Sequence, residues 1–320
     1  MPSVRLRSGC LVSFGDYGSR FGQAVFAFHG AFSCHSFFAL FDELAAQCGV
    51  RLLAPDRPGQ GGSDYDAAFS VETWPAIVAE LALALDIEHF CVLGFSEGGL
   101  FASACALRIP NAKLRRVLIV SGLSDLRSLT VAPMDGSIAF PKRAIDRAIF
   151  WLQTRLPWLW VPGRIACCIL CITLPSFVIS LLLLTLTWLL PASDGAILRP
   201  APVRAALAAD VKRATGSWGR SSKFWGQVHE GLLLACSRQV CIGESAAPPP
   251  LSANCCQVAV WHGDSDNVVP PHMGKTAARI LRGTFRLLEG AGHMWLLSNM
   301  HSALSALAAE DFEGFVPASS

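Results

Sequence analysis

Short, continuously apolar runs that end in Gly or Asp recur along the chain, and each is followed by a segment with helical periodicity. The first two are AVFAFHG (24–30) and VRLLAPD (50–56), and the last two are CQVAVWHGD (256–264) and TFRLLEG (284–290). Apolar runs without polar alternation predict strands covered on both faces, which requires a parallel sheet between two layers of helices. We therefore expect an α/β fold with a mostly parallel, doubly wound sheet.

The alternation is interrupted once, and this interruption defines the predicted domain organisation. We assign residues 1–123 and 252–320 to one α/β core and residues 124–251 to an insertion. A stretch rich in Pro, Ser and Ala, GESAAPPPLSAN (243–254), fits the linker that returns to the core. Within the insertion, Pro202 is expected to open a helix.

Composition excludes some classes of protein. The net charge is +2 and no basic cluster occurs, so a phosphate-binding face for nucleic acid is not expected. The twelve cysteines form no disulfide framework and no pair of C-x-x-C motifs with zinc-like spacing, so we expect reduced thiols and no metal site. The N-terminal segment has no apolar core typical of a secretory signal. We expect a cytoplasmic protein that is not secreted.

The sequence GFSEGG (94–99) joins a predicted strand to a predicted helix and places Ser96 in a G-x-S-x-G pattern. In this setting the turn is so tight that the serine takes a strained backbone conformation, and Gly94 and Gly98 leave room for it. The turn lifts the hydroxyl above the sheet edge. It also leaves the Glu97 N–H at the start of a helix, where it can stabilise an oxyanion. The pattern favours a nucleophile over an ordinary strand-to-helix turn.

A serine hydroxyl needs a base, and the base needs a carboxylate that orients it. The candidate base is His293, in a Gly-flanked loop after the last predicted strand, although a surface loop histidine would look the same. The preceding loop offers Asp264 and Asp266, and we prefer Asp266 because it lies farther into the loop. Asp264 is then a turn-bracing residue, and Asp125 is the fallback acid. The order Ser, Asp, His, each after its own strand, predicts a catalytic triad.

Together these motifs resemble those of the α/β-hydrolase family, across both blocks of the predicted core. The resemblance implies an α/β-hydrolase fold in which the insertion forms a helical cap over the active site. HGAFSCHSF (29–37) is similar to the family's His-Gly motif. By that resemblance, the Ala31 N–H is the second oxyanion donor, with Phe32 as a substitute, and His29 braces the loop.

A second loop, DRPGQGGSD (56–64), resembles the family's DRPGxGxS loop, and it implies that Asp56 and Arg57 pair locally and hold the loop. One position departs from the family's pattern, because Glu97 stands where many relatives carry Met, Gln or a small residue. A carboxylate beside an oxyanion hole would oppose the charge that forms there. We therefore expect the Glu97 side chain to point away or to find a partner.

The run IACCILCITLPSFVISLLLLTLTWLL (165–190) is long enough to span a bilayer. A single span, however, would separate Ser96 from Asp266 and His293, so the triad could not assemble. Because Pro175 interrupts the run, two shorter helices that meet at a bend are expected.

Three possibilities remain for this run: a lid that lines an acyl-chain pocket, a lid that also enters the membrane interface, or a hairpin with residues 148–162 as its first arm. Tryptophans flank the run, as interfacial aromatics or as cap core: Trp151, Trp158, Trp160 and Trp188. We favour a lid with contact to a membrane surface.

The triad and the resemblance imply a serine hydrolase, similar to esterases and lipases, that cleaves a carboxylic ester with an apolar acyl chain. Its substrate would be a small-molecule or lipid ester, and no cofactor is implied. Two alternatives stay open: an acyltransferase, in which an alcohol or thiol replaces water, and a ligand-binding or scaffold protein without turnover.

Overall fold

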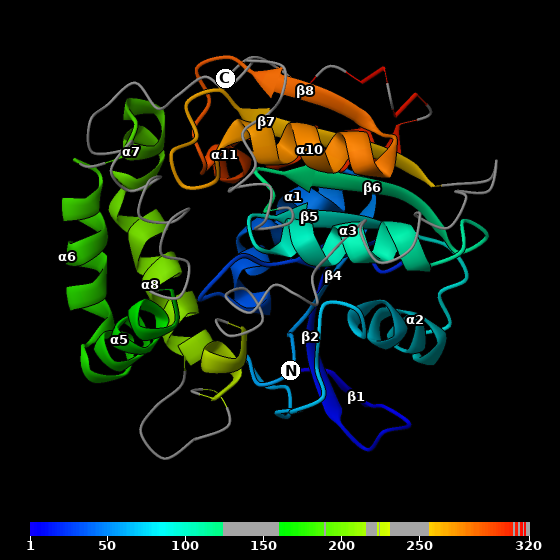
Figure 1. Ribbon diagram of the computed structural model, residues 1–320, viewed down its shortest axis with the longest axis horizontal. Coiled ribbons are helices and arrows are strands. Elements are labelled where there is room, and N and C mark those ends of the chain that lie inside the picture. Colours follow the sequence, from blue (N-terminus) through cyan, green and yellow to red (C-terminus); the bar gives the residue numbers. More distant parts are fainter. Residues whose placement is uncertain are drawn as a thin grey trace.

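The computed structural model describes residues 1–123, 160–188, 190–215, 223, 225–230, 256–309, 311, 312, 314, 315 and 317. Within this part of the chain, one sheet of eight strands has the order β1-β2-β4-β3-β5-β6-β7-β8 (Figure 1). The strand bounds are Ser3–Arg5 (β1), Leu11–Gly18 (β2), Gln23–Phe28 (β3), Val50–Pro55 (β4), Phe90–Phe95 (β5), Leu114–Val120 (β6), Gln257–Gly263 (β7) and Thr284–Leu288 (β8). Strands β3 to β8 pair in parallel, whereas β1 and β2 are antiparallel.

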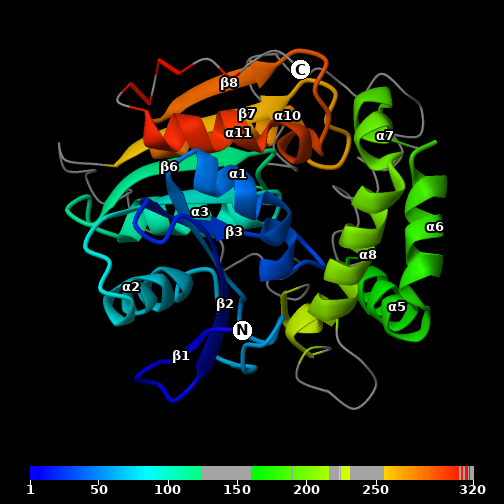
Figure 2. The same ribbon diagram turned by 180° about the vertical axis from the view of Figure 1, so that it is seen from behind.

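Helices cover both faces of the sheet, as Figures 1 and 2 show from opposite sides. The helices of the core are η1 (His35–Phe41, a 3₁₀ helix), α1 (Asp42–Gln47), α2 (Trp74–Ala84), α3 (Gly98–Arg108), α10 (Pro271–Leu281) and α11 (Trp295–Ala308). One apolar cluster lies between the sheet and α2, α3 and α10, and a second lies between the opposite face and η1, α1 and α11. The predicted doubly wound α/β fold is confirmed.

The described part of the insertion includes the helices α5 (Trp160–Thr173), α6 (Ser176–Leu186), α7 (Ala192–Leu198) and α8 (Ala201–Thr215). They lie together beyond one end of the strands, at the left of Figure 1. The apolar run is divided as predicted, because Pro175 has an extended ψ of 150° and ends α5 before α6 begins. Pro202 lies in the first turn of α8, also as predicted.

No helix in the described part of the chain combines the length and the apolar content that crossing a bilayer requires. Several predictions fall outside the described residues: the ends of the insertion, the linker at 243–254, the fallback acid Asp125, and residues 148–159 of the possible first arm.

Buried carboxylates from the insertion contact three loops of the core, and all three loops follow the carboxyl end of a strand. Asp210 of α8 accepts hydrogen bonds from the hydroxyl groups of Ser33 (2.7 Å) and Ser36 (2.6 Å), after β3. Glu230 forms an ion pair with Arg57, after β4. Asp194 of α7 accepts hydrogen bonds from the loop after β8. The insertion is therefore fastened to the edge of the sheet at which the strands end.

We expect Asp210→Ala to lower the free energy of unfolding by about 2–4 kcal/mol, because it leaves buried hydroxyl groups without an acceptor. Glu72→Ala is the control, since its ion pair with Arg108 spans 3.5 Å between half-exposed side chains and contributes at most about 0.5 kcal/mol. Urea denaturation measures both values. Equal losses in the two variants would contradict the docking role of Asp210.

Candidate active site

Ser96 lies in the tight turn between β5 and α3, and its φ of 54° is in the left-handed region that non-glycine residues seldom adopt. The chain is crowded on both sides of it. A Cβ atom on Gly98 would lie 2.1 Å from the carbonyl oxygen of Phe28, and one on Gly94 would lie 2.6 Å from the Cβ of Ala102. The strained strand-to-helix turn is therefore present where G-x-S-x-G predicts it.

A chain of hydrogen bonds connects Ser96 to the two residues proposed as its partners. Nε2 of His293 lies 3.0 Å from the Ser96 hydroxyl oxygen, and Nδ1 of His293 lies 2.9 Å from Oδ2 of Asp266. The other oxygen of Asp266 accepts the backbone N–H groups of Val268 (2.9 Å) and Val269 (2.8 Å). Three residues from the loops after β5, β7 and β8 thus meet at one edge of the sheet.

Asp264, the alternative acid, forms other contacts. The side chain of Asp264 is exposed, and one of its oxygens accepts a hydrogen bond from the Ser265 hydroxyl at 2.9 Å. Its backbone N–H donates to the carbonyl of Leu288 at 3.0 Å, which fits the expected role of bracing the turn.

Within this set of hydrogen bonds, the neighbouring charges shift the pKa values of Asp266 and His293. Burial alone would raise the pKa of Asp266, but the neighbouring imidazoles of His293 and His262 outweigh it, and its pKa is well below the ordinary value. Burial alone would lower the pKa of His293, but the charge and hydrogen bond of Asp266 outweigh it, and the pKa of His293 is raised. Asp266 is therefore ionised at neutral pH, and it favours a proton on His293.

His262, at the end of β7, was not predicted from the sequence. Its Nε2 lies 2.8 Å from the carbonyl oxygen of Val269 and 3.3 Å from Oδ2 of Asp266. The buried His262 and His293 therefore contact the same oxygen of the Asp266 carboxylate. The only sequence signal is its position two residues before Asp264 in WHGDSD.

Asp194 was also missed, and it comes from the insertion. Its two oxygens accept the backbone N–H groups of His293 (2.8 Å) and Met294 (2.8 Å). Burial raises the pKa of Asp194, and hydrogen bonds from both backbone groups oppose that shift. The signal that could have found it is an aspartate that ends the uncharged run, at the start of α7. Helix α7 therefore holds the loop that carries His293.

The loop after β3 runs beside the nucleophile. A Cβ atom on Gly30 would lie 3.1 Å from the Cβ of Ser96, so Ala31 follows directly after the point of contact. Phe32 has a positive φ of 54°. His29 is fully buried, its Nδ1 lies 3.0 Å from the carbonyl oxygen of Gly30, and burial together with the Arg57 charge lowers its pKa to about 3. A neutral, buried His29 fits the expected bracing role.

Glu97 has the partner that the sequence analysis expected. Its side chain is buried, and its carboxylate lies 3.9 Å from the guanidinium of Arg57. Arg57 also donates to the carbonyl oxygens of His29 (2.7 Å) and Gly30 (3.1 Å), and it pairs with Glu230. The negative charge beside Ser96 is thus balanced by a buried cation.

The expected pairing of Asp56 with Arg57 is wrong. Asp56 instead accepts hydrogen bonds from His35 and from the Ser13 hydroxyl (2.5 Å), whereas Arg57 reaches Glu230 and the backbone after β3. Neighbours in sequence point in different directions here, because each side chain finds its own buried partners.

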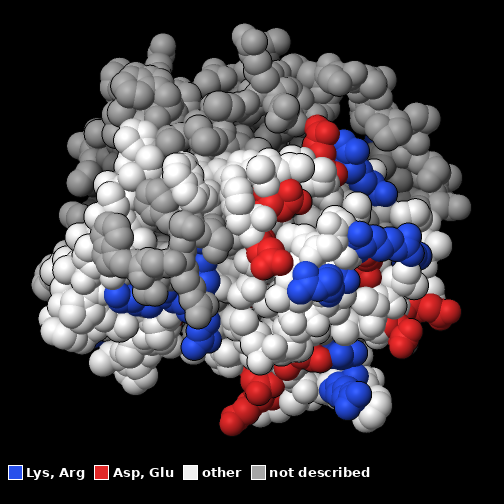
Figure 3. Space-filling model, turned by 90° about the horizontal axis from the view of Figure 1, so that it is seen from below, with Lys and Arg blue, Asp and Glu red and all other residues white. Residues whose placement is uncertain are grey.

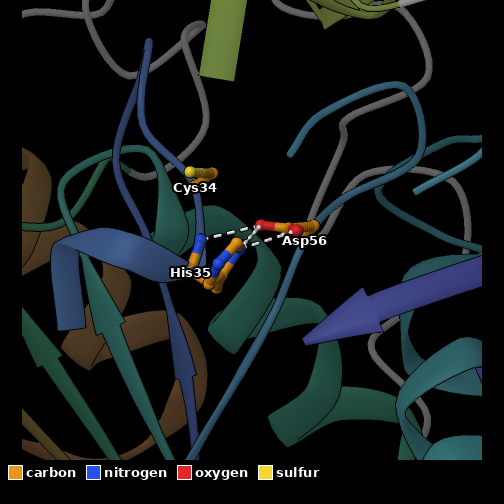
Figure 4. Close-up of side chains that lie close together, drawn as sticks. All are labelled: Cys34, His35 and Asp56. Carbon is orange, nitrogen blue, oxygen red and sulfur yellow. Dashed lines mark hydrogen bonds and ion pairs between the residues drawn. The ribbon is translucent and has the colours of Figure 1, made fainter. Parts of the chain in front are cut away.

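Among the described residues, Cys34, His35 and Asp56 form a group whose potential metal ligands lie within 4.8 Å of one another (Figure 4). Each already has a protein partner. Nδ1 of His35 lies 2.8 Å from Oδ2 of Asp56, and the Cys34 sulfur lies 3.2 Å from Oδ1 of Asp210. Burial raises the pKa of the Cys34 thiol, whereas a metal binds the thiolate. This set of donors fits a hydrogen-bonded brace better than a metal site.

Comparison with known proteins identifies the family. The profile of the alpha/beta hydrolase family matches residues 24–307, and the chain belongs to this family. A segment of 116 residues is 31% identical to a proline iminopeptidase of Lactiplantibacillus plantarum, and it covers 35% of this chain and 40% of that protein. The chain therefore matches less than half of that relative's length.

Solved structures share the fold over nearly the whole chain. An esterase from Exiguobacterium antarcticum has a TM-score of 0.62 and 17% identity, over 96% of this chain and 97% of its own. A hydrolase from Pseudomonas aeruginosa has a TM-score of 0.61 and 16% identity, over 95% of each chain. At such identities the likeness establishes the fold and no more.

We expect Asp266→Asn to lower kcat by about 10⁴-fold, because an amide does not hold the imidazole in the tautomer that can accept a proton. Asp264→Asn, two residues away in the same loop, is expected to retain activity within about twofold, because its side chain is exposed. Ester turnover by the two purified variants measures the difference. A strong loss in Asp264→Asn with an active Asp266→Asn would reverse the assignment.

The pH dependence follows from the raised pKa of His293. A general base must be neutral, so kcat/KM should rise with pH through an apparent pKa above the ordinary histidine value of about 6.5. The Asp194 charge contributes to that shift, so Asp194→Asn should move this limb to lower pH. It should also lower kcat, because one acceptor for the His293 loop is lost. An unchanged profile would show that Asp194 does not act on His293.

Proposed function

We propose that the chain is a serine hydrolase that cleaves a carboxylic ester with an apolar acyl chain. The observation that carries this proposal is the continuous set of hydrogen bonds from Ser96 through His293 to Asp266, at 3.0 and 2.9 Å, on a strained turn. Each of these features serves nucleophilic catalysis, and a purely structural loop requires none of them.

In the proposed reaction, the Ser96 oxygen attacks the ester carbonyl while Nε2 of His293 accepts its proton. Asp266 stabilises the imidazolium that forms. The backbone N–H groups of Glu97 and Ala31, with Phe32 as the substitute for Ala31, hold the oxyanion. The tetrahedral intermediate collapses, His293 returns the proton to the leaving alkoxide, and an acyl-enzyme remains. Water then attacks the acyl-enzyme by the same steps and releases the acid.

Aromatic surroundings support an apolar acyl group. The ring of Phe95 lies 5.4 Å from the imidazole of His293, and Phe37 stacks on Phe95 at 5.5 Å. We propose that the inserted helices form a cap over this site, since Asp194 and Asp210 fasten them to the loops around Ser96. Several solved structures of the same fold are named as esterases, which agrees with this choice.

A fluorophosphonate probe tests whether Ser96 is activated. We expect the wild-type protein to be labelled and Ser96→Ala to remain unlabelled. Ser265→Ala is the control, because that hydroxyl only donates to Asp264 on the surface and should not affect labelling. Absence of labelling in the folded wild type would contradict the hydrolase and support a ligand-binding protein.

Chain length in a series of p-nitrophenyl esters tests the acyl group. Each methylene that becomes buried should raise kcat/KM by about fourfold, since its transfer from water is worth about 0.8 kcal/mol. Adding acceptor alcohols and analysing the products separates hydrolysis from acyl transfer. A preference for acetate over longer acyl chains would contradict the proposed apolar acyl group. It would not contradict an activated Ser96, which the labelling experiment tests separately.

A further inference from the structure

The outward side of α5 and α6 is apolar and exposed. Large apolar side chains on it include Phe177, which is 68% exposed, and Trp188, which follows α6 and is 83% exposed. We define the outer face by the exposed side chains Cys167, Ile169, Leu170, Phe177, Leu181, Leu182, Leu186 and Trp188. Contiguous apolar surface of this kind marks a contact with a partner or a lipid surface.

Helix α6 is apolar all round, which is unusual for a helix with one side in water. Ile179 is buried, and Leu183 packs against the core cluster on the inner side. The opposite side of the same helix carries Phe177 and Leu181 at a spacing of four residues. Packing against the protein therefore accounts for one side of α6 only.

The threonine hydroxyl groups of α5 and α6 form hydrogen bonds within their own helices. Thr173 donates to the carbonyl oxygen of Ile169 at 2.9 Å, and Thr185 donates to that of Leu182 at 2.8 Å. A hydroxyl with an internal acceptor costs little to remove from water, whereas an unsatisfied one is expensive in an apolar medium. These helices can therefore enter an apolar environment.

A basic side chain lies beside α5. Lys212 of α8 donates to the carbonyl oxygen of Ile172 in α5 at 3.1 Å, whereas the neighbouring Arg213 faces the core, where its charge acts on Tyr17. The run from Ile165 to Ser193 contains no acidic residue. Seen from below in Figure 3, the side of the molecule on which α5 and α6 lie carries blue side chains and no red ones.

We propose that the outer face of α5 and α6 docks on the surface of an anionic lipid bilayer. The two helices lie in the interfacial plane, with Phe177 and Leu181 among the acyl chains, Trp188 at the headgroup level, and Lys212 beside anionic headgroups. This arrangement needs no membrane-spanning helix, and it is independent of whether Ser96 is catalytic.

Lys212 distinguishes this partner from a second copy of the chain. In a two-fold symmetric dimer the same patch packs on itself, and the run from Ile165 to Ser193 offers no acidic side chain to pair with Lys212. A charge that is buried without a partner opposes association. An anionic surface attracts the same side chain.

Vesicle flotation of the full-length protein tests the proposal, with phosphatidylcholine vesicles and with vesicles that also contain phosphatidylserine. We expect binding to the mixed vesicles. The double variant Phe177→Gln, Leu181→Gln should bind roughly tenfold or more weakly. Lys212→Gln should weaken binding to the mixed vesicles by about fivefold, as expected for one basic residue near an anionic surface, and should not change binding to phosphatidylcholine alone.

Phe21→Gln is the matched control, because Phe21 is 96% exposed between β2 and β3, outside the outer face. It should bind as the wild type does. Failure of the wild type to bind mixed vesicles, or an equal loss in Phe21→Gln, would overturn the proposal. So would a wild-type dimer in lipid-free buffer that the double variant abolishes. Turnover of a short, water-soluble ester should be unchanged in all these variants, so a failed docking test leaves the proposed hydrolase standing.

Discussion

The strained turn at Ser96 is the constraint on which the site depends. A left-handed conformation at a serine costs on the order of 1–3 kcal/mol and persists only where the surroundings enforce it. Here β5 lies between two parallel neighbours, and α3 packs so closely that a Cβ atom on Gly98 would collide with the Phe28 carbonyl. The sheet thereby fixes where the hydroxyl points. Loops after two other parallel strands then deliver His293 and Asp266 to the same edge, because parallel strands all end on one side.

The insertion contributes buried charge to this arrangement. Asp194 binds the backbone of the His293 loop, and Asp210 binds the loop after β3. Glu230 pairs with Arg57, which also balances Glu97 beside Ser96. Each of these acidic groups loses hydration on burial, so each needs its partner to be tolerated. The inserted helices and the core therefore stabilise the loops around Ser96 jointly. A displacement of α7 would remove hydrogen bonds from the loop that carries His293.

Local signals in the sequence predicted the doubly wound sheet, the turn at Ser96, and the break at Pro175, because a tight turn and a helix break depend on residues close together in the chain. The contacts of Asp194 with His293 were not predictable in this way, since 99 residues separate the two and no periodicity marks the pairing. The prediction that Asp56 pairs with Arg57 was wrong because that contact, too, is decided by residues distant in sequence. Adjacency in sequence does not fix which buried partner a side chain reaches, and here Asp56 meets His35.

Peptide mapping of a trapped acyl-enzyme tests whether Ser96 is the nucleophile. The protein is mixed with a p-nitrophenyl ester, quenched in acid during the first turnovers, and digested for mass spectrometry. We expect a burst of about one equivalent of p-nitrophenol and the mass of one acyl group on the peptide that contains Ser96. Ester cleavage with the acyl group on another residue, or with no acylated peptide and no burst, would contradict a nucleophilic role for Ser96.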